Sequence, residues 1–241
     1  MTQHAPAGTS NGGQFVSGGG SHPSDAALHR VLGGLTHADL VKAFSVNGLT
    51  AKHVKTEPFD IEGTRGVGVL FHLHNQSGQK VGFIRRSFQV TSTGEKHVEH
   101  DQFKLSTEYQ GKGTAKSLLK NSVELYQKHG ISKIKLDAGM DAGRYVWASM
   151  GFVANPKAVA QYRDAFSKWV AEHHREHATQ AAHDIARMTS MHEISQYSTK
   201  EHHLGKQFLM HAADRIPEWR GEMSVKNDNP QFQHFKKKIG L

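Results

Sequence analysis

The chain has 241 residues and contains no cysteine. Disulfide bonds, thiolate metal sites and a cysteine nucleophile are therefore excluded, and the composition fits a reducing compartment. No apolar run approaches the roughly 18 residues that a membrane-spanning helix needs. The amino terminus has neither a basic start nor an apolar segment like that of a secretory signal. We therefore expect a cytoplasmic protein without a membrane partner.

Acidic residues are outnumbered, with 22 Asp and Glu against 30 Lys and Arg, which gives a formal net charge of +8. Such a balance favours an anionic partner, which could be nucleic acid, an anionic cofactor or an acidic protein surface. Charge alone leaves the three open. The basic runs Arg85–Arg86 and Lys236–Lys238 could contact nucleic acid, although short basic segments are usually solvated surface.

Residues 1–24 hold almost nothing apolar and are dominated by Gly, Ser, Thr and Asn. This composition predicts a disordered Gly/Ser-rich tail. The stretch PAGTSNGGQF within it resembles amino-terminal peptides of some tailed-bacteriophage proteins. That resemblance implies a phage-encoded protein, made in the cytoplasm of a bacterial host, with association with the virion as an alternative.

Residues 25–156 alternate between helical and strand-like patterns. Thr36 and Asp39 predict the start of a short helix, as N-cap and capping-box partner. Two alternating apolar segments joined by the turn residues 75–78 predict a hairpin, and residues 97–106 predict a third strand. An amphipathic helix ending at Gly130, a short strand, another helix and a strand from Phe152 follow. The order indicates a mixed α/β domain.

Residues 157–241 have a different character. Apolar side chains recur at helical spacing from Val159 to Val170 and again around Phe208, which predicts a helical C-terminal extension. This region could dock to a protein partner. Aromatic side chains at this spacing are more typical of a packing stripe than of a nucleic-acid platform.

The stretch STEYQGKGTAKSLL, residues 106–119, lies between the third strand and the amphipathic helix. Glycines at a helix N-terminus allow free backbone N–H groups to approach an anion. The spacing from Gly111 to Lys116 is one residue too short for the phosphate loop of nucleoside triphosphatases. The glycine pattern of dinucleotide-binding proteins is also incomplete, because Lys116 stands where its third glycine would be. The alternative is that the glycines only allow a tight turn from strand to helix and bind no ligand.

The pattern Gln110-x-x-Gly113-x-Ala115 resembles the acetyl-coenzyme A signature of the GCN5-related N-acetyltransferase (GNAT) superfamily. The resemblance covers roughly residues 60–155 and includes KIKLD after the helix and YVWASMGF at the end. It implies a GNAT-like, mainly antiparallel sheet flanked by helices. It also implies that acetyl-CoA is held by Leu105, Gln110, Gly111, Lys112, Gly113, Thr114, Ala115 and Lys116.

The same resemblance implies that an amine acceptor, which the sequence does not identify, attacks the thioester directly. A base must first deprotonate that amine, and Asp101 or Glu99, which two-residue alternation places on one face with Phe103 and Leu105, could serve. The family's acid is often a tyrosine at the position of Trp147, and indole cannot deliver a proton. Tyr145 lies about 200° away around an ideal helix.

Three outcomes therefore stay open. Tyr145 acts as the acid, water acts as the acid, or the chain is a non-catalytic structural or partner-binding protein of the GNAT fold.

The 19 histidines could include metal ligands. His72 and His74 share a strand face, and His173 and His177 are four residues apart on a helix, but neither pair has a clear third ligand. We therefore predict no metal site.

Overall fold

The computed structural model describes residues 22, 24–139, 142–212 and 216–241. The peptide that prompted the comparison with phage proteins lies outside these residues. The described helices are α1 (Asp25–Leu32), α2 (His37–Phe44), η1 (Thr107–Tyr109), α3 (Thr114–Lys128), α4 (Gly143–Ser149), α5 (Pro156–His173), η2 (Arg175–His177), α6 (Ala178–Ala186), α7 (Met191–Gln196), α8 (Leu204–Gln207), the π-helix η3 (Phe208–Ala212) and α9 (Pro230–Ile239). The described strands are β1 (Thr50–Ile61), β2 (Thr64–His74), β3 (Lys80–Val90), β4 (Lys96–Leu105), β5 (Lys133–Ala138), β6 (Val153–Ala154) and β7 (Trp219–Ser224).

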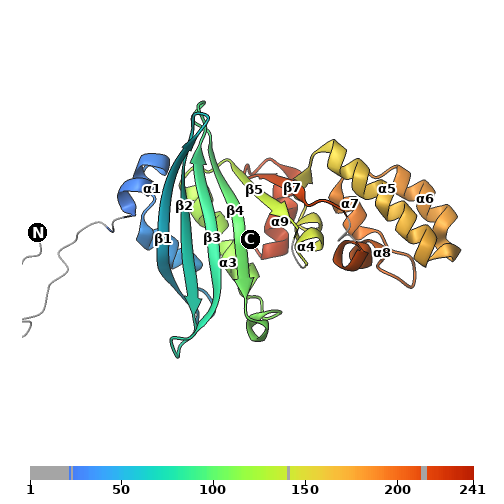
Figure 1. Cartoon of the computed structure of the whole chain (residues 1–241), viewed down its shortest axis with the longest axis horizontal. Helices are drawn as coiled ribbons and strands as arrows, with labels where there is room; N and C mark the ends of the chain where they lie inside the picture. Colours follow the sequence, from blue (N-terminus) through green and yellow to red (C-terminus); the bar gives the residue numbers. More distant parts are fainter. Residues whose placement is uncertain (1–21, 23, 140–141, 213–215) are drawn as a thin grey trace, which may run out of the picture.

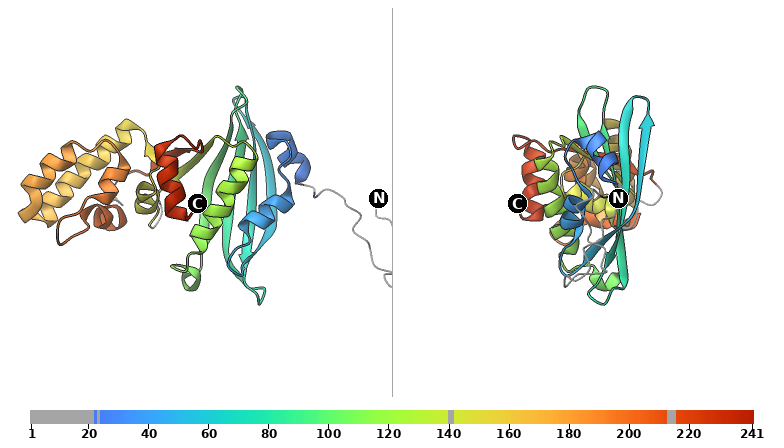
Figure 2. Two further views of the ribbon diagram at one scale, coloured as in Figure 1. Left: turned by 180° about the vertical axis from the view of Figure 1, so that it is seen from behind. Right: turned by 90° about the vertical axis from the view of Figure 1, so that its left-hand side faces the viewer.

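The seven strands form one sheet in the order β1-β2-β3-β4-β5-β7-β6 (Figure 1). β4 and β5 pair in parallel, and the other neighbouring strands pair antiparallel. Helices α1, α2, α3 and α9 cover one face of the sheet (Figure 2). The predicted mixed α/β fold with a mainly antiparallel sheet and flanking helices is confirmed.

The amino-terminal part begins with the two predicted short helices. The hydroxyl of Thr36 accepts a hydrogen bond from the Asp39 amide, and the Asp39 carboxylate accepts one from Thr36, so the predicted capping box is present. Strand β1 was not predicted, because its side chains are mostly exposed, as expected of an edge strand, and follow no clean alternation. His22 and Ser24 fall within the predicted tail but belong to the described fold, and Ser24 is buried.

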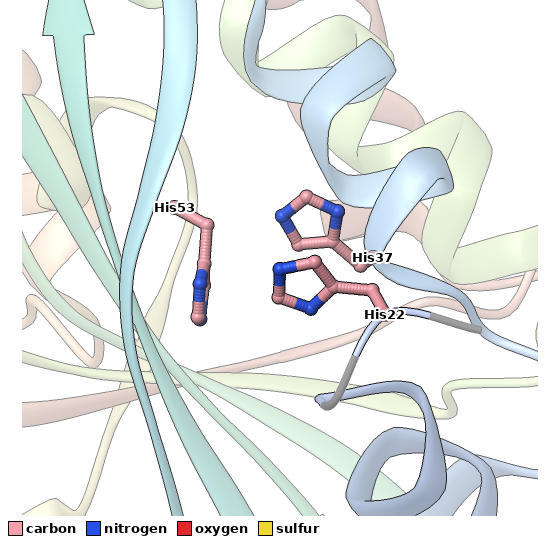
Figure 3. A group of neighbouring side chains, drawn as sticks. All are labelled: His22, His37 and His53. Atoms are coloured by element: carbon pink, nitrogen blue, oxygen red, sulfur yellow. The ribbon is translucent and has the colours of Figure 1, made fainter. Parts of the chain in front are cut away.

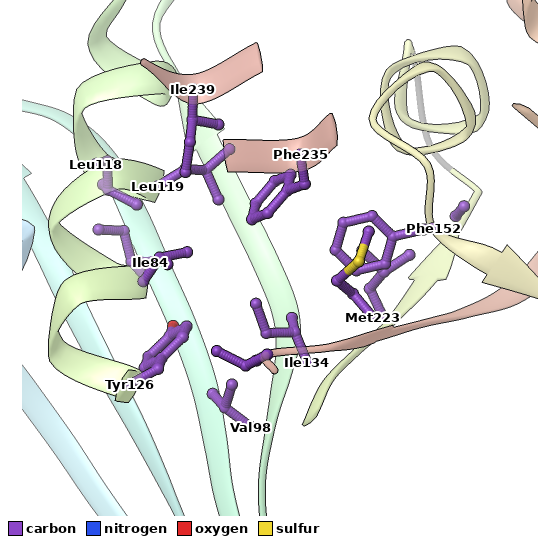
Figure 4. Packing of buried hydrophobic residues seen from close by; sticks show 14 of the residues in the cluster. Ile84, Val98, Leu118, Leu119, Tyr126, Ile134, Phe152, Met223, Phe235 and Ile239 are labelled. Carbon is purple, nitrogen blue, oxygen red and sulfur yellow. The ribbon is translucent and has the colours of Figure 1, made fainter. Parts of the chain in front are cut away.

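The core lies between the sheet and the helices on its covered face. Val67, Val69, Phe71 and Leu73 alternate along β2 and are all buried, as period-two patterning requires. Leu118 of α3 and Phe235 of α9 enter the same core from neighbouring helices (Figure 4). Among the described residues, no helix combines the length and the apolar character that crossing a membrane requires.

The helices after residue 156 do not form a terminal extension. Helices α5 to α8 and η3 lie between β6 and β7, and β7 then returns to the sheet between β5 and β6. The helical group projects from one side of the sheet (Figure 1). The boundary predicted at residue 156 is therefore wrong, because residues 219–224 pair with both β5 and β6 and α9 packs on α3.

Candidate active site

The stretch between β4 and α3 forms a short, tied corner, which we call the glycine corner (residues 106–116). The Ser106 amide and hydroxyl both donate to the carbonyl oxygen of Val81, at 2.8 and 3.0 Å. The Gln110 side-chain amide donates to the carbonyl oxygen of Leu105 at 2.9 Å. These bonds fix the corner to the ends of β3 and β4, so Gln110 orients the turn through its side chain.

Two glycines give the glycine corner its path. Gly111 and Gly113 have φ angles of +71° and +78°, which side chains other than glycine rarely adopt. A Cβ atom added at either position would meet nothing within 4 Å, so protein side chains do not fill the space in front of them. Here the chain turns from strand into helix, and that space is open.

Backbone amides in the glycine corner lack protein acceptors. In α3 the Ser117 amide bonds to the Gly113 carbonyl at 3.0 Å. Within the part of the chain that the structure describes, the amides from Gly111 to Lys116 find no carbonyl partner. Free amides at a helix N-terminus concentrate roughly half a positive charge. The glycine corner can therefore accept an anion.

Lysines surround this corner. The Lys112 ammonium lies 5.7 Å from the centre of the Tyr109 ring, and Lys116 lies beside Gly240, at the end of α9. The last turn of α9 carries residues 236–238, all lysines, so this basic run, which sequence reasoning treated as solvated surface, lies at the N-terminal end of α3. Thr114 is buried and Ala115 is exposed, and their backbone amides are among those without a carbonyl partner in the described structure.

Strands β4 and β5 diverge just before this corner. They pair at three positions, from His97 opposite Lys133 to Glu99 opposite Lys135. Further on, β4 continues to pair with β3, while β5 continues to pair with β7. Backbone groups that face each other across this gap are thus available to a ligand. A separate hollow of about 590 Å³ lies at the other end of α3, beside Gly130.

A β-bulge lies where the strands diverge. Glu99 pairs with Ser87 and Gln102 pairs with Arg85, so two residues of β4 stand opposite one residue of β3. Phe103 pairs with Ile84, three residues from Ser87 and therefore on the other face of β3. The prediction that Glu99 shares a face with Phe103 and Leu105 is wrong, because the bulge interrupts the alternation.

The two predicted carboxylates differ in their partners. Glu99 is bound on both sides, by the Arg220 guanidinium at 3.0 Å and by the Gln89 amide at 3.2 Å. Asp101 accepts a hydrogen bond of 3.3 Å from the Ser87 hydroxyl. Protein atoms around Asp101 disfavour its charged form and raise the pKa of the carboxyl, although its side chain reaches solvent. Asp101 is thus the more available proton acceptor.

A buried polar cluster lies beneath the bulge. Arg86 is 1% exposed, and its guanidinium donates to the Gln102 carbonyl at 2.9 Å, which holds the bulged segment. The Tyr126 hydroxyl lies 3.0 Å from the His100 ring nitrogen. Burial, with the nearby Arg86 cation, lowers the pKa of His100 well below its usual value. Sequence reasoning missed this cluster, whose signal was a histidine and an arginine at core positions of two strands.

Helix α4 presents different aromatic residues to its two sides. The Trp147 ring lies 6.1 Å from the His100 ring and 5.2 Å from Phe152, both in edge contacts. Tyr145 lies instead beneath the Lys206 ammonium, 5.7 Å from its ring centre. Trp147 therefore faces β4, while Tyr145 contacts the helical insertion, by which we mean the helices between β6 and β7. The assignment of Tyr145 as the acid stays a prediction.

Comparison with known proteins points to one family. Residues 52–167 match the family described as an acetyltransferase (GNAT) domain. Among curated proteins, none matches the chain.

Several solved structures are similar over part of the chain. A GNAT family acetyltransferase from Elizabethkingia anophelis with acetyl-CoA bound is 12% identical, with 46% of this chain and 79% of that chain covered and a TM-score of 0.30. A tandem GNAT protein from the clavulanic acid biosynthesis pathway is 20% identical, with 40% and 31% covered and a TM-score of 0.30. A glucosamine N-acetyltransferase region of a fungal multi-domain β-N-acetylglucosaminidase is 28% identical, with 29% and 8% covered and a TM-score of 0.25. The chain thus spans less than a third of the length of the last two, and the family model matches residues 52–167 alone.

Proposed function

We propose that this chain, whose residues 52–167 match an acetyltransferase (GNAT) domain, moves an acetyl group from acetyl-CoA to an amine. The free amides of Gly111 to Lys116 carry the proposal. They lie at the junction of β4 and α3, in front of open space and beside the gap between β4 and β5. An extended ligand with an anionic end fits this combination.

The glycine corner would hold the phosphates of coenzyme A. Backbone N–H groups and the N-terminal end of α3 favour negative charge there. Lys112, Lys116 and the lysines at the end of α9 add positive charge to the same end of the molecule. The acyl arm would then extend into the gap, where backbone groups of β4 and β5 are free to bond with it.

In the transfer step, Asp101 would take a proton from the acceptor amine. The amine nitrogen attacks the thioester carbon, a C–N bond forms, and the C–S bond breaks to release the coenzyme A thiolate. The raised pKa of Asp101 makes its carboxylate a stronger base than an ordinary aspartate. Glu99 is already held by Arg220 and would position the neighbouring strand.

The departing thiolate needs little help. A thiol has an ordinary pKa of about 8.5, so the proton can come from solvent or from the nitrogen that becomes protonated when the amine attacks. Tyr145 points to the insertion, and Trp147, which faces β4, cannot supply a proton. The presence of Trp147 also favours a second candidate function, a GNAT-fold protein that binds coenzyme A without transferring an acetyl group.

Coenzyme A titration followed by thermal unfolding tests the binding step. Ligand at about 100 times its Kd should stabilise the wild-type protein by roughly 2.7 kcal/mol. Gly113→Val should abolish this shift, because its side chain would enter the space in front of the amides. Gly130→Val is the matched control, since Gly130 also has a positive φ (+68°) and open space around it, at the other end of the same helix.

Both variants should lose stability through the strained backbone, and the control alone should keep the shift. Absence of a shift in the wild-type protein at millimolar coenzyme A would remove the proposal. If coenzyme A still stabilises Gly113→Val, the phosphates bind at a place other than the glycine corner.

Mass analysis after incubation with acetyl-CoA and a cell extract tests the transfer step and identifies the acceptor. An acetylated amine product supports the transferase, whereas coenzyme A binding without any product supports the non-catalytic candidate. If neither coenzyme A binding nor acetylation occurs and nucleic acid binds with a steep salt dependence, the basic charge serves a nucleic-acid partner instead.

A further inference from the structure

Three histidines from distant parts of the chain meet at one edge of the sheet. His22 precedes α1, His37 begins α2 and His53 belongs to β1, and the three side chains point toward a common space (Figure 3). Each offers a ring nitrogen, and these nitrogens all lie within 4.8 Å of one another. The rings of His22 and His37 are stacked with centres 3.7 Å apart, and His53 is edge-on to both.

Hydrogen bonds join the backbone segments of this cluster and engage two of its three rings. The Asp25 carboxylate accepts the backbone amides of His22 and His37, at 2.8 and 2.6 Å, and so ties the two segments together. The Ser24 hydroxyl lies 2.5 Å from one ring nitrogen of His22, and the Thr56 hydroxyl lies 2.8 Å from one of His53. A hydrogen bond to one ring nitrogen orients an imidazole and leaves its other nitrogen for a metal ion.

The cluster also contains a ring nitrogen without a partner among the described residues. The Nε2 atom of His37 is buried and has no hydrogen-bond partner within the described structure. A buried polar atom without a partner is costly, and a ligand would satisfy it.

We propose that His22, His37 and His53 bind one divalent transition-metal ion of the class that prefers imidazole, with Zn²⁺ as the reference ion. Metal–nitrogen bonds of about 2.0–2.1 Å require the three nitrogens to approach one another, which rotation of the partly exposed side chains allows. A water molecule would complete a tetrahedral site.

This metal site lies apart from the proposed transfer site. Strands β2 and β3 separate β1 from β4, so the ion would take no part in the attack on the thioester. It would instead join the segment before α1, the start of α2 and the edge strand β1, which are otherwise linked there by the Asp25 bonds and ring contacts. The inference does not depend on the proposed function.

Titration of the metal-free, full-length protein with Co²⁺, read by visible absorption, and competition by Zn²⁺ test the proposal. The wild-type protein should bind one Co²⁺ ion with the intense absorption of a tetrahedral site. His22→Gln and His37→Gln should each raise the Kd by at least ~100-fold, because even changes to outer-shell partners typically cost 10–100-fold.

His173→Gln is the matched control, because His173 is an exposed histidine on α5 and its removal should leave the Kd unchanged. If His37→Gln does not fold, as judged by circular dichroism, His22→Gln decides, since it precedes the first helix. An unchanged Kd and spectrum in His22→Gln, or a wild-type protein that shows weak binding unaffected by any of these substitutions, would overturn the proposal.

Discussion

The two halves of β4 differ although they belong to one continuous strand. Its first half, up to Glu99, pairs with β3 on one side and β5 on the other. Its second half pairs with β3 alone, begins at a bulge and leads into the glycine corner. The first half carries the fully buried Val98, and the second carries Asp101, whose pKa is raised. Pairing on both sides thus supports the fold, and pairing on one side leaves backbone and carboxylate groups for a ligand.

The largest effect is expected from Asp101→Asn, in the second half. An amide cannot accept the proton of the amine, so kcat should fall by about 100-fold or more, while the stabilisation by coenzyme A is retained. Steady-state kinetics with the identified acceptor measures the change. A normal acetylation rate would show that Asp101 is not the base. The second half of β4 would then have no demonstrated part in the transfer step.

Val98→Ala, in the first half, should instead act on stability. Its side chain is fully buried, and truncation leaves a cavity that should lower the free energy of unfolding by about 2 kcal/mol. Urea denaturation measures this change, and coenzyme A should still stabilise the folded variant. Lys104→Ala, in the exposed part of the second half, should change the free energy of unfolding by less than about 0.5 kcal/mol. Equal losses of unfolding free energy in Val98→Ala and Lys104→Ala would contradict the division of β4 into a stabilising half and a ligand-binding half.

Glu99→Gln, at the boundary, should have a smaller effect. The substitution removes the charge that pairs with Arg220, and more than half of the Arg220 side chain is exposed, so the loss should be about 0.5–1 kcal/mol. The acetylation rate should change little. A loss of activity as large as that of Asp101→Asn would show that Glu99 is the base and would exchange the two assignments.

Ser87→Ala should give the smallest effect, seen in the pH dependence. The Ser87 hydrogen bond lowers the pKa of Asp101 against the raising effect of burial, so its removal should raise that pKa further and move the rise of kcat/KM to higher pH. The folded protein keeps a proton on Asp101 at pH values where the unfolded chain has released it. The free energy of unfolding therefore falls as the pH rises from the ordinary aspartate pKa to the raised one. A shift to lower pH would contradict this account.

Local patterns predicted much of the fold. Thr36 and Asp39 define a capping box within four residues, and the hairpin of β2 and β3 follows from alternation on either side of a turn. The glycine corner is likewise a single short stretch, and its two positive φ angles agree with the glycines found there. Signals of this kind need no knowledge of distant partners.

Features that depend on pairing between distant segments were missed. The bulge exists in the register between β3 and β4, so nothing within β4 itself reveals that Glu99 and Phe103 lie on opposite faces. Strand β7 is six residues long and follows a helical region, and its place in the sheet is set by β5 and β6. His22, His37 and His53 are far apart in the sequence, and the turn of the chain through α1 and α2 brings them together.

The position of β7 has a consequence for the order in which the protein can assemble. Because β7 is made after helices α5 to α8 but fits between β5 and β6, a growing chain on a ribosome leaves one side of β5 bare until residue 224 has emerged. A bare strand invites pairing with other chains. The insertion therefore delays the pairing of β7 with β5. A fragment that stops at residue 167 would leave that edge of β5 unpaired permanently.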